Sequence, residues 1–165
     1  KLTSEVKVIA YQRPERLSST RLDDCIDKAL ISLGSKADDL NIQIHLNEGY
    51  VNAEPTRLER IFANLFSNTL DACYEHKIPA EIIFNSNLIN NKVQIQIEDN
   101  GPGVDESTLA HLFEPFYTSK TIGKGLGLGL AISANLAKDM QGTLAVKQGT
   151  PSGLTFILTL EQTAP

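Results

Sequence analysis

The sequence predicts an α+β fold, a two-layer α/β sandwich in which a mixed sheet of about five strands packs against three main helices. Three long segments carry apolar residues at helical spacing, and five shorter segments have the alternating or apolar character of strands. Four of these strands form two pairs joined by short turns. They can therefore form hairpins and leave the helices to gather on one face of the sheet.

Length and composition indicate one acidic globular domain. The chain has 165 residues, 41% of them hydrophobic and 21% charged, which is enough for a substantial core. A net charge of −5 argues against a broad nucleic-acid or anionic-membrane surface, so we expect no nucleic-acid partner and no direct membrane contact. Cys25 and Cys73 lie inside helical patterns and outside any metal-ligand spacing. As buried, reduced thiols they suit a cytoplasmic location.

The first residues look like the end of a preceding element. Residues 1–13 place Leu2, Val6 and Ile9 at helical spacing and stop before Pro14, so we expect the last turns of a helix followed by a linker. Because the chain begins with Lys rather than Met, we expect it to be part of a longer protein. The main domain is then expected to occupy residues 14–165.

The domain is expected to open with a helix and a strand. An amphipathic pattern over 22–33 predicts the helix, and Gly34 ends it. Alternation over 41–46 predicts the strand, with His45 on the face opposite its apolar residues. We therefore expect His45 to be a surface residue.

A long helix is expected over 55–75, with Glu54 as an acceptable N-cap before a proline at the first helical position. Asn64 and Asn68 lie one turn apart on the border of its buried stripe. Asparagine is a mediocre helix former, so two amides in this place need a reason. The functional interpretation is that amide oxygens bind a hard cation such as Mg²⁺. Solvent-facing filler is the alternative.

The second half of the domain is expected to hold four strands and the third main helix. These elements are strands over 81–85, 92–99, 143–147 and 154–160 and a helix over 130–140. Polar turns over 86–91 and 149–153 join the strands into two hairpins. Between the hairpins, Asp105 can cap a short helix over 106–112.

Two glycine clusters lie where regular elements meet loops. Gly101 and Gly103 directly follow the strand that ends at Asp99, and glycines at 123, 125, 127 and 129 lead into the helix over 130–140. Glycine lets the backbone approach a ligand closely, and a helix N-terminus leaves free N–H groups for an anion. The clusters predict a phosphate cradle with a carboxylate beside it; two ordinary turns are the alternative.

The aspartate at the strand end suits recognition of a flat base. Adenine offers an exocyclic amine, and an ionised carboxylate only accepts hydrogen bonds. A plain turn former is the alternative for Asp99. The Walker A and G-x-G-x-x-G patterns do not occur, so neither a P-loop nor a Rossmann dinucleotide site is supported.

A segment with the character of a lid separates the two glycine clusters. Residues 113–120 are rich in aromatic side chains, contain a proline and break the helical pattern. We expect Phe113 and Phe116 to anchor this segment and the part beyond them to be mobile.

Four blocks in fixed order resemble the ATP-binding domain of sensor histidine kinases, whose fold is shared with gyrase B, Hsp90 and MutL. The blocks are Asn64-Leu-Phe-Ser-Asn68-Thr-Leu-Asp-Ala, Asp99-Asn-Gly101-Pro-Gly103, Phe113-Glu-Pro-Phe116-Tyr-Thr-Ser-Lys and Gly125-Leu-Gly127-Leu-Gly129-Leu-Ala-Ile. They are similar to the N box, the first glycine box, the F box and the second glycine box, and the resemblance covers about residues 22–160. The last two blocks are similar to those of nitrogen-regulation and dicarboxylate-transport sensor kinases.

The resemblance implies a role for each matching residue. Asn68 would be the main Mg²⁺ ligand, and Asn64 would support the metal or the phosphates. Asp99 would bind the adenine amine above a floor shaped by Gly101 and Gly103. The candidate cofactors are therefore ATP and Mg²⁺.

The second glycine box and the lid would contact the triphosphate. Backbone N–H groups would come from Gly125, Leu126, Gly127, Leu128 and Gly129. The Thr often found at the second position of this box is Leu126 here, which removes a hydroxyl but leaves the backbone donors. Lys120 and Lys124 are candidate phosphate contacts, and Lys120 joins the two asparagines as a candidate catalytic residue. Thr155 matches a family threonine that helps hold Asp99 and a water against the base.

The implied function is transfer of the γ-phosphoryl group of ATP to a histidine. In gyrase-type ATPases a glutamate that activates water occupies the position of Asn64, so asparagine argues against efficient hydrolysis. Family acceptor histidines are usually followed by an acidic residue, whereas His45, His76 and His111 precede Leu, Lys and Leu. The acceptor is thus expected on a dimerisation hairpin absent from this chain, of which residues 1–13 would be the end.

The same resemblance implies the partners and the location. They are the domain's own hairpin and a downstream response regulator, with the isolated domain expected to be a monomer. The parent is expected to be a bacterial inner-membrane sensor kinase whose cytoplasmic part holds this domain. Two alternatives stay open: a clamp-type ATPase that uses ATP as a conformational switch, and a nucleotide-binding scaffold without transfer activity.

Overall fold

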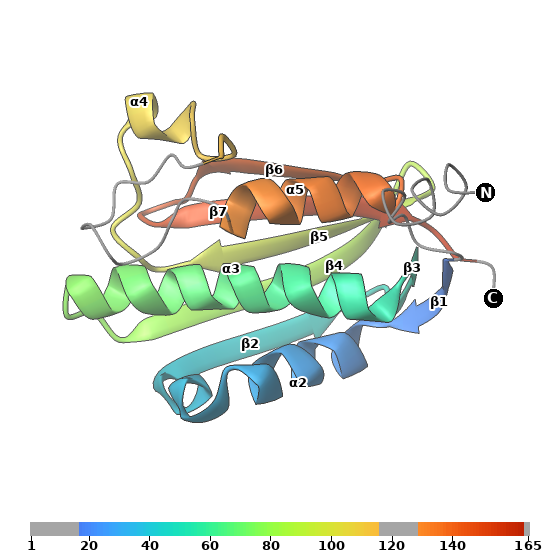
Figure 1. Ribbon diagram of the computed structural model, residues 1–165, viewed down its shortest axis with the longest axis horizontal. Coiled ribbons are helices and arrows are strands. Elements are labelled where there is room, and N and C mark those ends of the chain that lie inside the picture. The colour runs from blue at the N-terminus through green and yellow to red at the C-terminus, as the bar shows by residue number, and fades with distance from the viewer. Residues whose placement is uncertain (1–16, 116–128, 164–165) are drawn as a thin grey trace, which may run out of the picture.

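The computed structural model describes residues 17–115 and 129–163 and has two layers (Figure 1). One layer is a five-stranded sheet in the order β2-β4-β5-β7-β6, in which β2 and β4 are parallel and the other neighbours are antiparallel. Its strands are β2 (Leu40–Leu46), β4 (Ala80–Ile89), β5 (Lys92–Asp99), β6 (Thr143–Gln148) and β7 (Leu154–Glu161). The predicted mixed sheet of five strands is confirmed.

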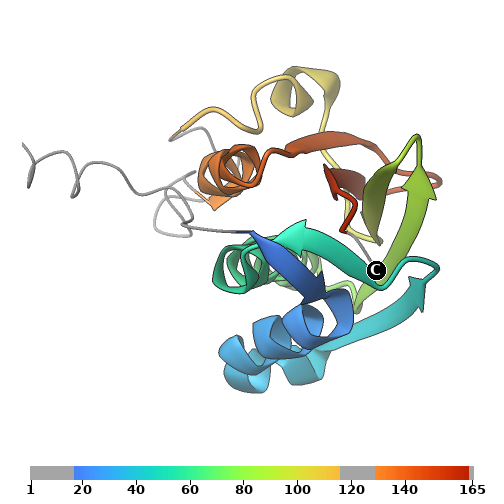
Figure 2. The same cartoon turned by 90° about the vertical axis from the view of Figure 1, so that its right-hand side faces the viewer.

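The other layer consists of three helices that cover one face of this sheet (Figure 2). They are α2 (Leu22–Ser32), α3 (Pro55–Glu75) and α5 (Gly129–Asp139). The helix predicted to end at Gly34 does so, since Gly34 has a φ of +65° that a residue with a side chain adopts only under strain. The predicted N-cap of α3 is also confirmed, because the Glu54 carboxylate accepts a hydrogen bond of 2.9 Å from the backbone N–H of Arg57.

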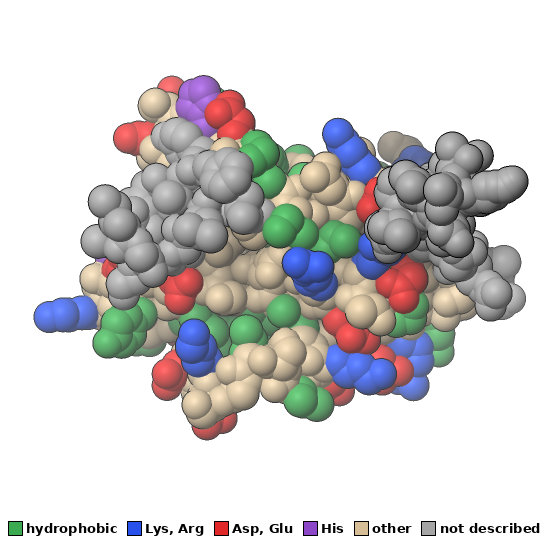
Figure 3. All heavy atoms as spheres, in the orientation of Figure 1, with side chains coloured by type: hydrophobic (Ala, Val, Ile, Leu, Met, Phe, Trp, Pro, Cys, Tyr) green, Lys and Arg blue, Asp and Glu red, His purple; other side chains and the backbone are tan. Residues whose placement is uncertain are grey.

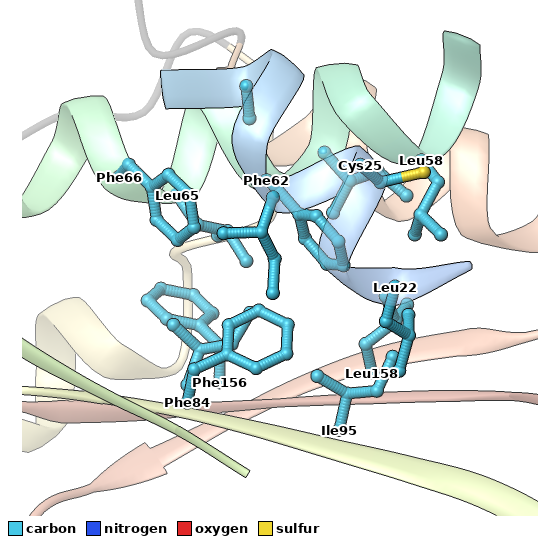
Figure 4. Packing of buried hydrophobic residues seen from close by; sticks show 14 of the residues in the cluster. Leu22, Cys25, Leu58, Phe62, Leu65, Phe66, Phe84, Ile95, Phe156 and Leu158 are labelled. Atoms are coloured by element: carbon cyan, nitrogen blue, oxygen red, sulfur yellow. The ribbon is translucent and has the colours of Figure 1, made fainter. Parts of the chain in front are cut away.

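Apolar side chains fill the space between the two layers (Figure 4). Phe62 on α3 lies edge-on to Phe84 on β4, with ring centroids 5.1 Å apart, and stacks on Phe66 at 6.2 Å. Cys25 and Cys73 are buried free thiols, as predicted. The core thus holds α3 firmly against the centre of the sheet.

A second, two-stranded sheet was not predicted. It pairs β1 (Ser18–Arg21) antiparallel with β3 (Tyr50–Ala53). Val51 and Ala53 are fully buried, and the Thr20 hydroxyl donates to the Ala53 carbonyl at 3.1 Å. Four-residue strands are too short to show a clear alternation, so only the burial in the folded chain identifies them.

The polar turn predicted over 86–91 was wrong in its extent. Strand β4 continues to Ile89, and the turn consists of Asn90 and Asn91, with φ of +53° and +65°. Two positive φ values suit a tight hairpin turn, and asparagine tolerates them. The residues before the turn belong to the strand because β5 pairs with all of them up to Ile89, and Ser86 pairs with Leu46 of β2 as well.

Two further short helices lie on the surface. The 3₁₀ helix η1 (Gly34–Asp39) links α2 to β2, and α4 (Glu106–Leu109) is shorter than the helix predicted over 106–112. The Asp105 carboxylate caps α4 as predicted, accepting a 2.7 Å hydrogen bond from the N–H of Thr108. His45 is exposed on β2, as predicted.

Charged side chains of both signs are interspersed over the helical face (Figure 3). None of the helices in the two described ranges combines the length and the apolar character that crossing a membrane requires. The predicted helix over 1–13 and the lid residues from 116 onward lie outside the described residues.

Candidate functional site

The carboxylate of Asp99 lies at the end of β5, the middle strand of the sheet. Its Oδ1 accepts hydrogen bonds from the backbone N–H groups of Gly101 at 2.9 Å and Leu154 at 3.1 Å. Its Oδ2 lies 3.1 Å from the hydroxyl of Thr69 on α3. An ionised carboxylate offers about four acceptor positions, so the three donors among residues 17–115 and 129–163 leave about one position, on Oδ2, for a ligand.

The backbone around this carboxylate needs residues without side chains. A Cβ atom on Gly101 would lie 3.2 Å from Asp99 Oδ1, closer than most real contacts allow. Gly153, in the turn before β7, has a φ of +83°, and a Cβ there would collide with the main-chain carbonyl of Asp99. Gly101 was predicted as a site residue, whereas Gly153 was predicted only as part of a turn. Two glycines from distant segments therefore enclose Asp99.

A polar side chain ties the loop after Asp99 to the neighbouring strand. The Asn100 amide accepts from the backbone N–H of Glu81 at 2.9 Å and donates to the carbonyl of Pro79 at 2.7 Å. The Cys73 thiol donates to the same amide oxygen at 3.6 Å. Burial, and to a smaller extent the nearby Asp99 carboxylate, raise the pKa of the Cys73 thiol, so it is a neutral neighbour of the site.

Asn64 lies on the side of α3 that faces α5. The Asn64 amide nitrogen donates to Ser133 Oγ at 3.0 Å and to the carbonyl of Gly129 at 3.3 Å. Both contacts use the nitrogen, which leaves the amide oxygen to other ligands. Asn68 follows one turn later and immediately precedes Thr69, so the amides and Asp99 belong to one region.

The donor set suits a metal that brings its own anionic ligands. Among residues 17–115 and 129–163, no group of three or more His, Cys, Asp or Glu side chains is arranged to hold a metal ion. Neutral amide oxygens remain, and Mg²⁺ is commonly held by few protein oxygens together with phosphates and waters. The site therefore fits a nucleotide-bound Mg²⁺ better than a metal bound by the protein alone.

The other predicted site residues divide into two groups. Gly103 has a φ of +73°, Gly129 is the first residue of α5, and Thr155 is a buried residue of β7 that pairs with Glu98. The hydrogen bonds to Asp99 come from Thr69, Gly101 and Leu154, so the role of Thr155 stays a prediction. Lys120, Lys124, Gly125, Leu126, Gly127 and Leu128 lie outside the described residues.

Phe113, the first predicted anchor of the lid, lies edge-on to Phe156 of β7 with ring centroids 6.5 Å apart. This contact confirms that Phe113 is fixed against the core. The second predicted anchor, Phe116, lies outside the described residues.

Comparison with known proteins identifies the family. Residues 53–164 match the family described as histidine kinase-, DNA gyrase B-, and HSP90-like ATPase. The chain belongs to this ATPase family. The match contains all four motif blocks and both glycines that enclose Asp99, Gly101 and Gly153.

Sequence relatives of this ATPase-family domain are sensor proteins. The C4-dicarboxylate transport sensor protein DctB of Pseudomonas aeruginosa is 36% identical over 157 residues, which are 92% of this chain and 26% of that protein. DctB of Rhizobium meliloti is 31% identical over 165 residues, 98% of this chain and 26% of that protein. The chain thus spans about a quarter of the length of these curated relatives, and it is a domain of the sensor histidine kinase type.

The fold of the ATPase-family domain agrees with a solved structure. The mycobacterial sensor histidine kinase MprB superimposes with a TM-score of 0.77 at 21% identity, over 90% of this chain and 100% of that chain. This likeness confirms the predicted α+β sandwich. The description of the matched family as an ATPase family supports ATP as its nucleotide.

Proposed function

We propose that this chain is the ATP-binding catalytic domain of a two-component sensor histidine kinase. It would bind ATP with Mg²⁺ and present the γ-phosphoryl group to a histidine on a separate dimerisation hairpin. The imidazole nitrogen forms the new P–N bond as the bond from the γ-phosphorus to the bridging oxygen breaks, and ADP leaves. Phosphoryl transfer of this kind needs positioning and charge neutralisation more than a protein base on this domain.

The observation that carries the proposal is the fixed carboxylate of Asp99. Its three hydrogen bonds hold it at the end of the middle strand, and about one acceptor position stays open. The exocyclic amine of adenine is a donor that fits this position. Gly101 allows the main chain to pass close to this carboxylate, because a Cβ there would lie 3.2 Å from Asp99 Oδ1.

The phosphate end of the nucleotide would lie toward α5. The oxygens of Asn64 and Asn68 would hold Mg²⁺, which neutralises charge on the phosphates when bound. The N-terminus of α5 begins at Gly129, and free N–H groups at a helix N-terminus favour phosphate. Lys120, Lys124 and the glycine box before Gly129 would complete this end.

The partners in this proposal are the domain's own hairpin and a response regulator. The parent protein would be a bacterial inner-membrane sensor kinase with this domain in the cytoplasm. DctB, which is named as a sensor protein for C4-dicarboxylate transport, is a relative of this kind. The domain by itself would be a monomer.

Mixing the chain with ATP labelled at the γ-phosphate and a separately prepared hairpin domain tests the proposal. Acid-labile label on a hairpin histidine is the expected result. Release of free phosphate without labelled hairpin would instead indicate a clamp-type ATPase. Gyrase-type ATPases have a glutamate that activates water at the position where this chain has Asn64. Nucleotide binding without either product would indicate a scaffold.

Two substitutions test the site assignment directly. Asn68→Asp and Asp99→Ala are each expected to abolish ATP binding measured by titration calorimetry, because one disturbs the metal site and the other removes the acceptor for adenine. Asn135→Asp is the matched control, since Asn135 is an exposed residue of α5. Micromolar affinity retained in both site variants would remove the assignment.

A further inference from the structure

We propose that Thr69 is a positioning residue that gives this site its selectivity for adenine, the purine whose exocyclic amine is at C6. Thr69 would do so by orienting Asp99 Oδ2 toward the base. The inference rests on the proposed function, because it assumes that Asp99 faces the nucleotide. No role was predicted for Thr69 from the sequence.

Among the buried residues of α3, Thr69 is the one that carries a hydroxyl group. The buried residues of α3 are Leu58, Ile61, Phe62, Leu65, Phe66, Thr69 and Cys73. Thr69 is 3% exposed, so its hydroxyl has little access to bulk water and must find a partner inside the protein. An apolar residue of similar size would fill the same volume without that requirement.

The hydroxyl has one hydrogen and two neighbouring acceptors. Thr69 Oγ1 lies 3.1 Å from Asp99 Oδ2 and 3.3 Å from the carbonyl oxygen of Leu65, one turn earlier on the same helix. Hydrogen bonds to an ionised acceptor are shorter and stronger than those to a neutral carbonyl. The hydrogen therefore points to Asp99 while the carboxylate is ionised.

The two carboxylate oxygens are held in different ways. Both donors to Oδ1 are backbone N–H groups, from Gly101 and Leu154, and they fix that oxygen in place. The side-chain donor to Oδ2 is Thr69. With Oδ1 held by the main chain, the Thr69 hydroxyl restrains Oδ2 and hence the direction of its open acceptor position.

An acceptor held in this way discriminates between bases. A base with an exocyclic amine donates to Oδ2, whereas a base that presents a carbonyl oxygen there would face a second acceptor and repel it. Sites built to bond one polar group reject analogues that lack it far more strongly than sites that only sense size. If the carboxylate is less well oriented, the affinity for ATP should therefore fall, while the weak affinity for other purine nucleotides should stay nearly unchanged.

The test compares three nucleotides on the wild-type chain, Thr69→Val and Thr69→Ser by titration calorimetry with Mg²⁺ present. The nucleotides are ATP, GTP and purine riboside triphosphate. GTP has a carbonyl at C6 in place of the amine of ATP, and purine riboside triphosphate has only a hydrogen there. Thr69→Val is expected to weaken ATP binding roughly tenfold and to change binding of purine riboside triphosphate little, so that the ratio of the two dissociation constants falls by about the same factor. Thr69→Ser keeps the donor and is expected to keep the wild-type ratio.

The ratio separates positioning from a structural effect, because a loosened fold would weaken all three nucleotides together. An unchanged ratio in Thr69→Val, or a ratio lost equally in Thr69→Ser, would overturn the inference while the proposed function stands. If Thr69→Val does not fold by circular dichroism, Thr69→Ala, which cannot overpack the core, takes its place with the same expectation. A wild-type chain that binds none of the three nucleotides would overturn the proposed function and this inference with it.

Discussion

Asn64 on α3 donates a hydrogen bond of 3.0 Å from its amide nitrogen to the hydroxyl oxygen of Ser133 on α5. Ser133 is fully buried, and the same nitrogen lies 3.3 Å from the carbonyl of Gly129, the first residue of α5. The position of the Asn64 amide is therefore coupled to the start of the helix that follows the second glycine box.

Replacing Ser133 by alanine is expected to weaken this coupling. The amide nitrogen of Asn64 would lose one of its two acceptors in a partly buried place, so the free energy of unfolding should fall by about 0.5–1.5 kcal/mol in urea titrations. Asn135→Ala, on the exposed side of the same helix, should change stability by less than about 0.5 kcal/mol. Equal stability of Ser133→Ala and wild type would show that the contact contributes nothing.

Gly153 is expected to tolerate no side chain. Gly153→Ala places a Cβ against the Asp99 carbonyl and 2.6 Å from its Oδ1, at a φ of +83°. The left-handed conformation alone costs about 1–2 kcal/mol for alanine, and the collision adds to it, so both thermal stability and ATP affinity should fall. Gly49→Ala is the control, because a Cβ at Gly49 meets no atom within 4 Å. A Gly153→Ala protein that binds ATP as wild type would contradict the described geometry.

The cap of α4 should depend on pH. The backbone N–H of Thr108 donates to Asp105 and lowers the pKa of that carboxyl. A lowered pKa in the folded state means that the stabilisation is present above the ordinary aspartate range, near about 4, and is lost as pH falls below it. The Thr108 amide resonance should therefore shift at acid pH in wild type but not in Asp105→Asn, which caps without titrating. Identical titration of both proteins would contradict the assignment.

Alkaline pH should lower stability through Cys25. Burial is the main reason that the pKa of this thiol rises to about 12. Because an unfolded cysteine titrates near about 8.5, the stabilisation is complete below that pH and is lost as pH rises toward 12. The free energy of unfolding of wild type should fall between pH 8 and 10 more steeply than that of Cys25→Ala, by up to about 1.4 kcal/mol per pH unit. Equal slopes would show that Cys25 does not stay neutral.

The main elements could be predicted because each has a period or a punctuating residue. Helix α3 combines a long apolar stripe with a proline at its first position, and β5 alternates cleanly from Val93 to Ile97. The pair β1 and β3 could not be predicted, since neither strand has a pattern of its own and each exists through its partner. The same reason explains why the end of β4 resembled a polar turn.

The residues of the candidate site that are adjacent in sequence could be predicted, whereas those that reach Asp99 from distant segments could not. Asp99 and Gly101 are adjacent in sequence, so a strand end followed by glycine indicated them. Thr69 and Gly153 lie 30 and 54 residues from Asp99, and no sequence pattern connects them to it. Their contacts depend on α3 crossing the end of β5 and on β7 pairing with it.

Asp99 terminates the strand with two neighbours on each side, with β4 and β7 directly flanking it. Moving its main chain would disturb its pairing with Ile82 of β4 and the adjacent pair of Glu98 with Thr155 of β7, so the carboxylate is preorganised before any nucleotide arrives. Little conformational entropy is then lost at the base end of the site on binding. A base recognised this way would dock onto a rigid surface.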